Sequence, residues 1–393
     1  MNGSNRHAVL ASTVFDGTAL HQECAVVIEG SCICGLAARR ELPAAMPIRT
    51  LPEGAWLAPG FIDVQVNGGG DVLFNDEPTP EGIGAIVAAH RQFGTTALVP
   101  TLISDTPAKM RAALDAVRRT IPVNPGVLGI HFEGPFLSPT KAGVHDPAMI
   151  RVPTSQDFEM LVAARVGCTL ITLAPEQMPA GFTAQLANAG IRVCLGHSMA
   201  TYAQTKSALA EGLAGFTHLF NAMRPLATRE PGPIAAALEA AGAWFGMIVD
   251  GVHVAPAMLR LALRGAAHPM LVTDAMPPVG GSTSTFTLYG QEISVRNGRC
   301  LRQDGTLAGA VLDMASAVRN CVQLLQVPLT HALRFASAEP ASFLGLDATL
   351  GRLAPGYRAD MVAFDAGDIR IYETWVAGEA TRTKLSRKPA SAP

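Results

Sequence analysis

Residues 96–133, TALVPTLISDTPAKMRAALDAVRRTIPVNPGVLGIHFE, decide the fold. The stretch begins and ends with short runs that are almost entirely apolar, TALVPTL (96–102) and VLGIHFE (127–133). Between them, AKMRAALDAVRRT (108–120) repeats its apolar residues at helical spacing. Two near-continuous apolar strands joined by a helix are typical of a parallel sheet that is covered on both faces.

The same alternation recurs along the central two-thirds of the chain. Further helices are expected, for example, at 81–93 and 201–213. Eight such units favour a closed (β/α)8 TIM barrel, an α/β fold, over an open doubly wound sheet. No G-x-G-x-x-G follows a strand, which also disfavours the open, dinucleotide-binding alternative. The expected strands are 61–67, 96–102, 127–133, 169–176, 192–198, 216–220, 245–251 and 270–275.

The two ends of the chain depart from this pattern, because they contain short strands separated by turn residues. We expect both ends to pair into one small β-sandwich beside the barrel. A β-hairpin is also expected at 284–300, with Asn297-Gly298 as a turn. The expected units are therefore a β-sandwich domain at 1–57 plus 350–383, a catalytic barrel domain at 58–349 and a disordered tail at 384–393.

The composition excludes several classes of protein. Hydrophobic residues make up 49% and charged residues 16%, which is incompatible with a disordered chain. A net charge of −2 gives no electrostatic signature for nucleic acid or an anionic membrane. The seven cysteines form no C-x-x-C pair and fit free thiols in a reducing compartment. Without a signal peptide or an uncharged 18-residue apolar stretch, we expect a cytoplasmic protein that binds no membrane.

Polar residues gather at the carboxyl ends of the expected strands, where the active sites of TIM barrels lie. Glu133, His197 and His218 each end a hydrophobic strand, and one carboxylate with two imidazoles is a known catalytic zinc set that leaves a position open for water. The same donors suit iron, manganese or cobalt. No short metal-binding motif such as H-E-x-x-H is present. The alternative is therefore that these three residues are core residues whose polar atoms are hydrogen-bonded within the protein. His131 is interpreted as such a core residue, with its side chain alternating away from that of Glu133.

Two aspartates at strand ends have two interpretations each. Asp274, at the end of the last strand, could face the metal as a general base and acid, or it could cap the segment that follows. Asp63, in the first strand, has the same two interpretations, and structural support is the one favoured.

Several segments resemble, in the same order, the N-acetylglucosamine-6-phosphate deacetylases of the amidohydrolase superfamily. The likeness extends from about Leu57 to about Asp365. It implies a TIM barrel that hydrolyses the acetamide of N-acetyl-D-glucosamine 6-phosphate to D-glucosamine 6-phosphate and acetate. The segments are LAPGFIDVQVNG (57–68), HFEGPFLSPTKAGVHDP (131–147), LAPE (173–176), LGHS (195–198), FTHLFNAM (216–223), REPG (229–232), VDGVHV (249–254), LVTDAM (271–276) and LGRLAPGYRADMVAFD (350–365).

The resemblance also implies roles for particular residues. It makes Glu133, His197 and His218 the ligands of one divalent metal, with zinc expected and iron, manganese or cobalt as alternatives, and Asp274 the general base and then the acid. The substrate contacts it implies are His145, Asn221, Ala222 through its backbone, and, for the phosphate, Arg229 and His253. It further implies a homodimer in which one phosphate contact serves the neighbouring subunit. Taken alone, Arg229 has the alternative of a surface ion pair with Glu230.

One departure from the wider superfamily bears on the metal. Most amidohydrolases carry H-x-H at the end of the first strand, whereas this chain has Gln65-Val66-Asn67. Amides are poor ligands for a transition metal, and no lysine ends the fourth strand to form a carbamylated bridge. We therefore expect a single-metal mechanism, in which one ion activates the attacking water.

Three other functions remain open at this stage. An N-acetylgalactosamine-6-phosphate deacetylase, or another amidohydrolase, would share the catalytic residues. A catalytically silent barrel that acts as a binding protein would usually have lost the ligands or Asp274, which are all present here. A TIM-barrel isomerase or aldolase would usually need a Schiff-base lysine or a glutamate base at a strand end. The few lysines fall outside the eight expected strands, which counts against the lysine mechanism.

Overall fold

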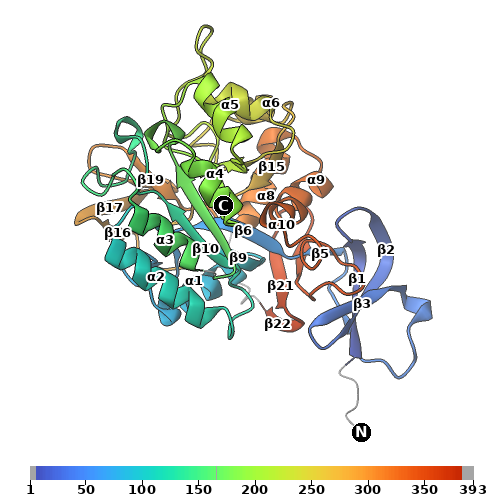
Figure 1. Cartoon of the computed structure of the whole chain (residues 1–393). Helices are drawn as coiled ribbons and strands as arrows, with labels where there is room; N and C mark the ends of the chain where they lie inside the picture. Colours follow the sequence, from blue (N-terminus) through green and yellow to red (C-terminus); the bar gives the residue numbers. More distant parts are fainter. Residues whose placement is uncertain (1–5, 165, 383–393) are drawn as a thin grey trace, which may run out of the picture.

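The computed structural model describes residues 6–164 and 166–382. Eight parallel strands form one sheet that curls into a barrel, which confirms the predicted fold class (Figure 1). In spatial order, the strands are β6 (Phe61–Val66), β9 (Thr95–Ile103), β10 (Gly129–Glu133), β11 (Cys168–Leu173), β12 (Arg192–Leu195), β13 (Gly215–Phe216), β14 (Trp244–Met247) and β15 (His268–Leu271).

The barrel closes where the segment after β15 meets β6. The backbone N–H of Asp274 donates to the carbonyl oxygen of Gln65 at 3.0 Å, and the N–H of Asn67 donates to the carbonyl oxygen of Ala275 at 2.9 Å. Val66 and Ala275 also form a parallel bridge. The seam therefore places Asp274 directly beside Gln65 and Asn67.

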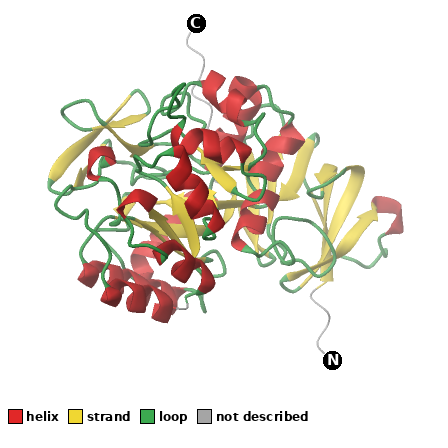
Figure 2. Ribbon diagram, turned by 45° about the horizontal axis from the view of Figure 1, so that its top comes forward, coloured by secondary structure: helices red, strands yellow, loops and turns green. Residues whose placement is uncertain are grey.

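Helices enclose the strands on the outside of the barrel (Figure 2). The first two, α1 and α2, both begin at the proline of a Thr-Pro pair. The threonine hydroxyl accepts a hydrogen bond from a first-turn N–H, and proline occupies the first helical position. None of the helices in the described ranges combines the length and apolarity that crossing a membrane requires. The helices are α1 (Pro80–Arg91), α2 (Pro107–Thr120), α3 (Ser155–Ala164), α4 (Phe182–Asn188), α5 (Tyr202–Ala210), α6 (Gly232–Glu239), α7 (Pro256–Ala262), α8 (Met314–Leu325), α9 (Leu329–Phe335) and α10 (Ala338–Leu344).

Strands from both chain ends share a second sheet, as predicted, and it projects from one side of the barrel (Figure 1). Strand β5 from the N-terminal part pairs with β20 from the C-terminal part in antiparallel fashion. The division of the chain at 57 and 350 stays a prediction, and the tail at 384–393 lies outside the described residues. The strands are β1 (Arg6–Phe15), β2 (Leu20–Glu29), β3 (Cys32–Ala38), β4 (Ile48–Thr50), β5 (Ala55–Pro59), β20 (Met361–Asp365), β21 (Ile371–Val376) and β22 (Glu379–Arg382).

A third sheet, on the opposite side of the barrel from the second, contains the predicted hairpin (Figures 1 and 2). The turn at Asn297-Gly298 is confirmed, with φ of 52° and 71°, the two left-handed residues that a tight hairpin turn requires. The sheet is larger than predicted, because a second hairpin turns at Tyr289-Gly290 and a fourth strand follows. Its strands are β16 (Thr285–Leu288), β17 (Gln291–Arg296), β18 (Arg299–Leu301) and β19 (Leu307–Ala310).

Candidate metal centre and active site

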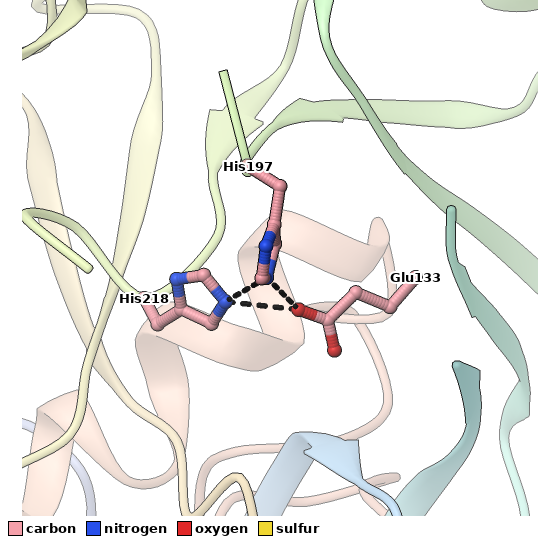
Figure 3. A group of neighbouring side chains, drawn as sticks. All are labelled: Glu133, His197 and His218. Carbon is pink, nitrogen blue, oxygen red and sulfur yellow. Dashed lines mark hydrogen bonds and ion pairs between the residues drawn. The ribbon is translucent and has the colours of Figure 1, made fainter. Parts of the chain in front are cut away.

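Glu133, His197 and His218 converge at the carboxyl end of the barrel (Figure 3). Glu133 is the last residue of β10, and each histidine lies two residues beyond the end of its strand, β12 or β13. Both histidines have a left-handed backbone, with φ of 48° at His197 and 30° at His218. Such backbone is costly for residues other than glycine and is concentrated at functional sites.

The three side chains form a small triangle of ligand atoms. Oε1 of Glu133 lies 3.0 Å from Nε2 of His197 and 2.9 Å from Nε2 of His218. The two Nε2 atoms are 3.1 Å apart (Figure 3). With metal–ligand bonds of about 2.1 Å, the corners of a tetrahedron lie about 3.4 Å apart, so the triangle is close to the size that one ion requires.

The hydrogen bonding of His197 also fits a cation at this point. Its Nδ1 lies 2.7 Å from the carbonyl oxygen of Lys141, which can only accept, so Nδ1 carries the proton. Nε2 is then the ring atom that faces Glu133 and that can bind a metal. An outer carbonyl that fixes the tautomer in this way is usual for metal-bound histidine.

A cavity of about 200 Å³ opens beside the triangle. It brings together all but one of the predicted site residues. The exception is Arg229, which is exposed in the loop before α6 and does not line the cavity. The predicted residues on its wall are Glu133, His145, His197, His218, Asn221, Ala222, His253 and Asp274.

The third sheet supplies a wall of the cavity that the sequence analysis missed. Thr306, Leu307 and Gly309, in β19 and just before it, line the cavity beside Met276. The backbone N–H of Ala310 donates to the carbonyl oxygen of Asp274 at 2.9 Å. No local sequence pattern indicates this contact, because the predicted hairpin carried no sign of which surface it would cover.

Burial and charge shift the pKa values of the two carboxyl groups of the site in opposite directions. Burial raises the pKa of Asp274 to about 6, and the negative charge of Glu133 adds to this effect. Burial opposes the ionisation of Glu133 as well, but the neighbouring imidazoles of His145, His197 and His218 outweigh it and keep its pKa well below the usual value. Glu133 therefore remains a carboxylate, while Asp274 can take up and release a proton near neutral pH.

Two further histidines on the cavity wall have their tautomers fixed by neighbours. Nδ1 of His145 accepts the backbone N–H of Ser104 at 3.2 Å, so the neutral ring carries its proton on Nε2. Burial lowers the pKa of His145 to about 4, which keeps the ring neutral. Nδ1 of His253 lies 2.6 Å from Oδ2 of Asp250. In both rings Nε2 remains for a ligand.

His131 and Asp63, the two residues interpreted as structural, lie inside the barrel. His131 is 2% exposed, and its Nε2 lies 2.8 Å from the Thr172 hydroxyl. Its expected orientation was wrong, because residues two apart on a strand share a face, and His131 lies on the same inner side as Glu133. The hydroxyl of Thr273 donates to Asp63 at 2.5 Å, which links β6 to the segment after β15.

The sequence profile described as the amidohydrolase family matches residues 56–385. The chain belongs to this family and is a metal-dependent hydrolase.

Three similar proteins are named as deacetylases of an N-acetylated hexosamine 6-phosphate. N-acetylgalactosamine-6-phosphate deacetylase of Shewanella sp. (strain ANA-3) is 43% identical, and the match covers 92% of each chain. A crystal structure of N-acetylglucosamine-6-phosphate deacetylase from Pasteurella multocida is 32% identical with a TM-score of 0.93, over 96% of this chain and 100% of that chain. A variant of the Mycobacterium smegmatis enzyme in complex with N-acetyl-D-glucosamine-6-phosphate is 35% identical with a TM-score of 0.88, over 96% and 99%.

Proposed function

We propose that the protein hydrolyses the acetamide of an N-acetylhexosamine 6-phosphate, releasing acetate and the hexosamine 6-phosphate. The observation that carries the proposal is the triangle of Glu133, His197 and His218 in one cavity with Asp274. A metal site and a carboxyl group with a pKa near neutrality are what hydrolysis of a stable amide requires. The names of the relatives supply the substrate class.

Each catalytic residue has a separate task in this proposal. Glu133, His197 and His218 would hold one divalent ion, for which we propose zinc. When bound, the ion lowers the pKa of water and stabilises negative charge on the amide oxygen. Asp274 accepts a proton from the water that attacks the carbonyl carbon, and it delivers that proton to the nitrogen as the C–N bond breaks.

We propose that the remaining residues of the cavity wall bind the substrate, together with a residue of a second subunit. His145 and Asn221, with the backbone of Ala222, contact the sugar, and His253 contacts the phosphate. Arg229 is exposed and outside the cavity of its own chain, which supports a role in the neighbouring cavity of a homodimer. Its planar guanidinium group binds two phosphate oxygens at once.

The epimer of the sugar has two candidates. N-acetylglucosamine 6-phosphate is the substrate that the sequence resemblance implies, and two structural relatives carry that name. The galacto epimer is favoured by the relative at 43% identity. The two sugars differ at the 4-hydroxyl alone, so a comparison of kcat/KM for the two sugar phosphates decides between them. The seven cysteines are free thiols, which fits the cytoplasmic location that we propose.

The direct test is acetate release from each sugar phosphate by the purified protein, with and without a chelator. We expect turnover that the chelator abolishes and that added zinc restores. His197→Ala should lose metal and activity together, because two ligands cannot complete the site. Turnover that survives complete removal of metal would contradict the proposal, as would a metal-loaded wild type that releases acetate from neither sugar.

A further inference from the structure

The amides of Gln65 and Asn67 contact both carboxylates of the site. Nε2 of Gln65 donates to Oε2 of Glu133 at 3.1 Å and to Oδ1 of Asp274 at 3.2 Å. Nδ2 of Asn67 donates to the same Oδ1 of Asp274 at 2.7 Å. Gln65 lies in β6 and Asn67 directly follows it. Both face Asp274 across the seam of the barrel, where a backbone hydrogen bond also joins Gln65 to Asp274.

The chemistry of the partners fixes the orientation of both amides. Oxygens of Glu133 and Asp274 both lie within hydrogen-bond distance of Nε2 of Gln65, and in an amide side chain only this nitrogen donates. The NH₂ group of Gln65 has two protons, one for each carboxylate. Asn67 likewise turns its NH₂ group to Asp274, which directs its own Oδ1 away from the carboxylate.

We propose that Gln65 and Asn67 are positioning residues that select the working oxygen of each carboxylate. Two N–H donors occupy Oδ1 of Asp274, so Oδ2 is the atom that takes the proton from the attacking water and returns it to the departing nitrogen. One N–H donor occupies Oε2 of Glu133, which leaves Oε1 facing the two histidines. This role rests on the proposed function.

The same donors reduce the repulsion between two neighbouring carboxylates. Glu133 is buried and Asp274 is half-buried, and in such surroundings like charges repel more strongly than in water. The N–H dipoles of Gln65 lie between the two carboxylates and point at both. An amide pair therefore supplies positive potential between these carboxylates without itself being a metal ligand.

Asn67 has a second polar side-chain atom, its amide oxygen. Its side chain is 2% exposed and lines the cavity, and its Oδ1 has no hydrogen-bond partner among the described residues. A buried acceptor without a partner is costly. A donor of the bound substrate, an N–H or an O–H, would satisfy it, and Asn67 would then connect the substrate to Asp274.

The test replaces each amide by an apolar side chain of similar size. For Asn67→Leu and Gln65→Met we expect kcat to fall about 10²-fold, because a misplaced catalytic group costs this much. Metal content should stay near that of the wild type and KM should change less than kcat. The solvent deuterium isotope effect on kcat should rise, because proton transfer becomes slower relative to the other steps.

Asn320→Leu is the matched control. Asn320 is a half-buried amide on α8 that donates to the carbonyl oxygen of Val249 at 2.8 Å and does not line the cavity. The kcat of the Asn320→Leu variant should equal that of the wild type. Asn67→Asp is the second variant if Asn67→Leu does not fold, since it keeps the size of the side chain and removes the N–H donors.

The outcomes separate this role from the proposed function. Variants with unchanged kcat, or with metal and kcat lost in proportion, would overturn the positioning role while an active wild type upholds the proposed function. A metal-loaded wild type that releases no acetate from either sugar phosphate overturns both.

Discussion

Nδ1 of His253 donates to Oδ2 of Asp250, three residues earlier, across 2.6 Å. Oδ1 of the same carboxylate accepts the backbone N–H groups of Val252 and His253 at 2.8 and 2.9 Å. Burial alone would raise the pKa of Asp250, but the hydrogen bonds with His253 lower it below the usual value. An ionised carboxylate therefore holds the imidazole with Nε2 directed to a ligand such as a phosphate.

Asp250→Asn should weaken the binding of the phosphate. The asparagine oxygen can keep the backbone hydrogen bonds, but the negative charge is lost and the hydrogen bond that holds Nδ1 of His253 is weakened. We expect kcat/KM for the sugar phosphate to fall about 10- to 100-fold, the equivalent of one charge-assisted hydrogen bond. The same measurement with the sugar that lacks the phosphate is the control. An equal loss for both sugars would contradict a phosphate contact by His253.

Asp274→Asn should abolish turnover and leave metal content near the wild-type level. Asparagine can keep its oxygen toward Asn67 and Gln65, so the seam of the barrel is preserved. It cannot accept a proton from water, and the loss of a general base costs about 10²- to 10⁴-fold. Metal analysis and steady-state kinetics on the same preparation check this. An active variant would remove Asp274 from the mechanism.

The dependence of activity on pH should follow the same carboxyl group. A general base works only when deprotonated, so activity rises as pH rises through its pKa. Burial, with the charge of Glu133, raises the pKa of Asp274 to about 6 in the metal-free protein. A bound cation favours the carboxylate and lowers this value. We therefore expect kcat/KM to decline with falling pH, with a midpoint at or below about 6, and a midpoint above 7 would point to another base.

The eight barrel strands could be predicted because strands buried on both faces appear as continuous apolar runs. For most of them the carboxyl end was placed too far along the chain. The expected strand at 192–198 ends at Leu195 and the one at 216–220 ends at Phe216. The left-handed backbone at His197 and His218 turns the chain out of the sheet, and this turn is a property of the site that strand propensity cannot indicate.

The ligand triangle was predicted from residues at strand ends, whereas the contacts of the amides were not. Gln65 and Asn67 were recognised as poor metal ligands, but their hydrogen bonds to Glu133 and Asp274 join residues between 68 and 209 positions apart. The placement of β19 on the cavity is a contact of the same kind. Such contacts depend on how the barrel closes and have no local signal in the sequence.

Gly309→Ala tests whether β19 must approach the catalytic segment closely. Gly309 has a φ of +67°, and an added Cβ would lie 2.5 Å from Cγ of Met276 and 3.1 Å from the carbonyl oxygen of Asp274. We expect a loss of about 1–2 kcal/mol from the left-handed backbone. The crowding should cost about 1–3 kcal/mol more. Because the neighbouring Ala310 is hydrogen-bonded to Asp274, kcat should also fall.

Gly305→Ala is the control for the backbone term, since Gly305 has a φ of +85° and no atom within 4 Å of an added Cβ. Thermal or denaturant unfolding of the two variants separates the backbone cost from the crowding cost. Both variants place an alanine in left-handed backbone, and only the Gly309 variant crowds Met276. Gly305→Ala should lose stability without losing kcat. Equal stabilities and equal kcat in the two variants would mean that β19 can move away from Met276 at no cost, and the sheet would then be a passive cover over the cavity.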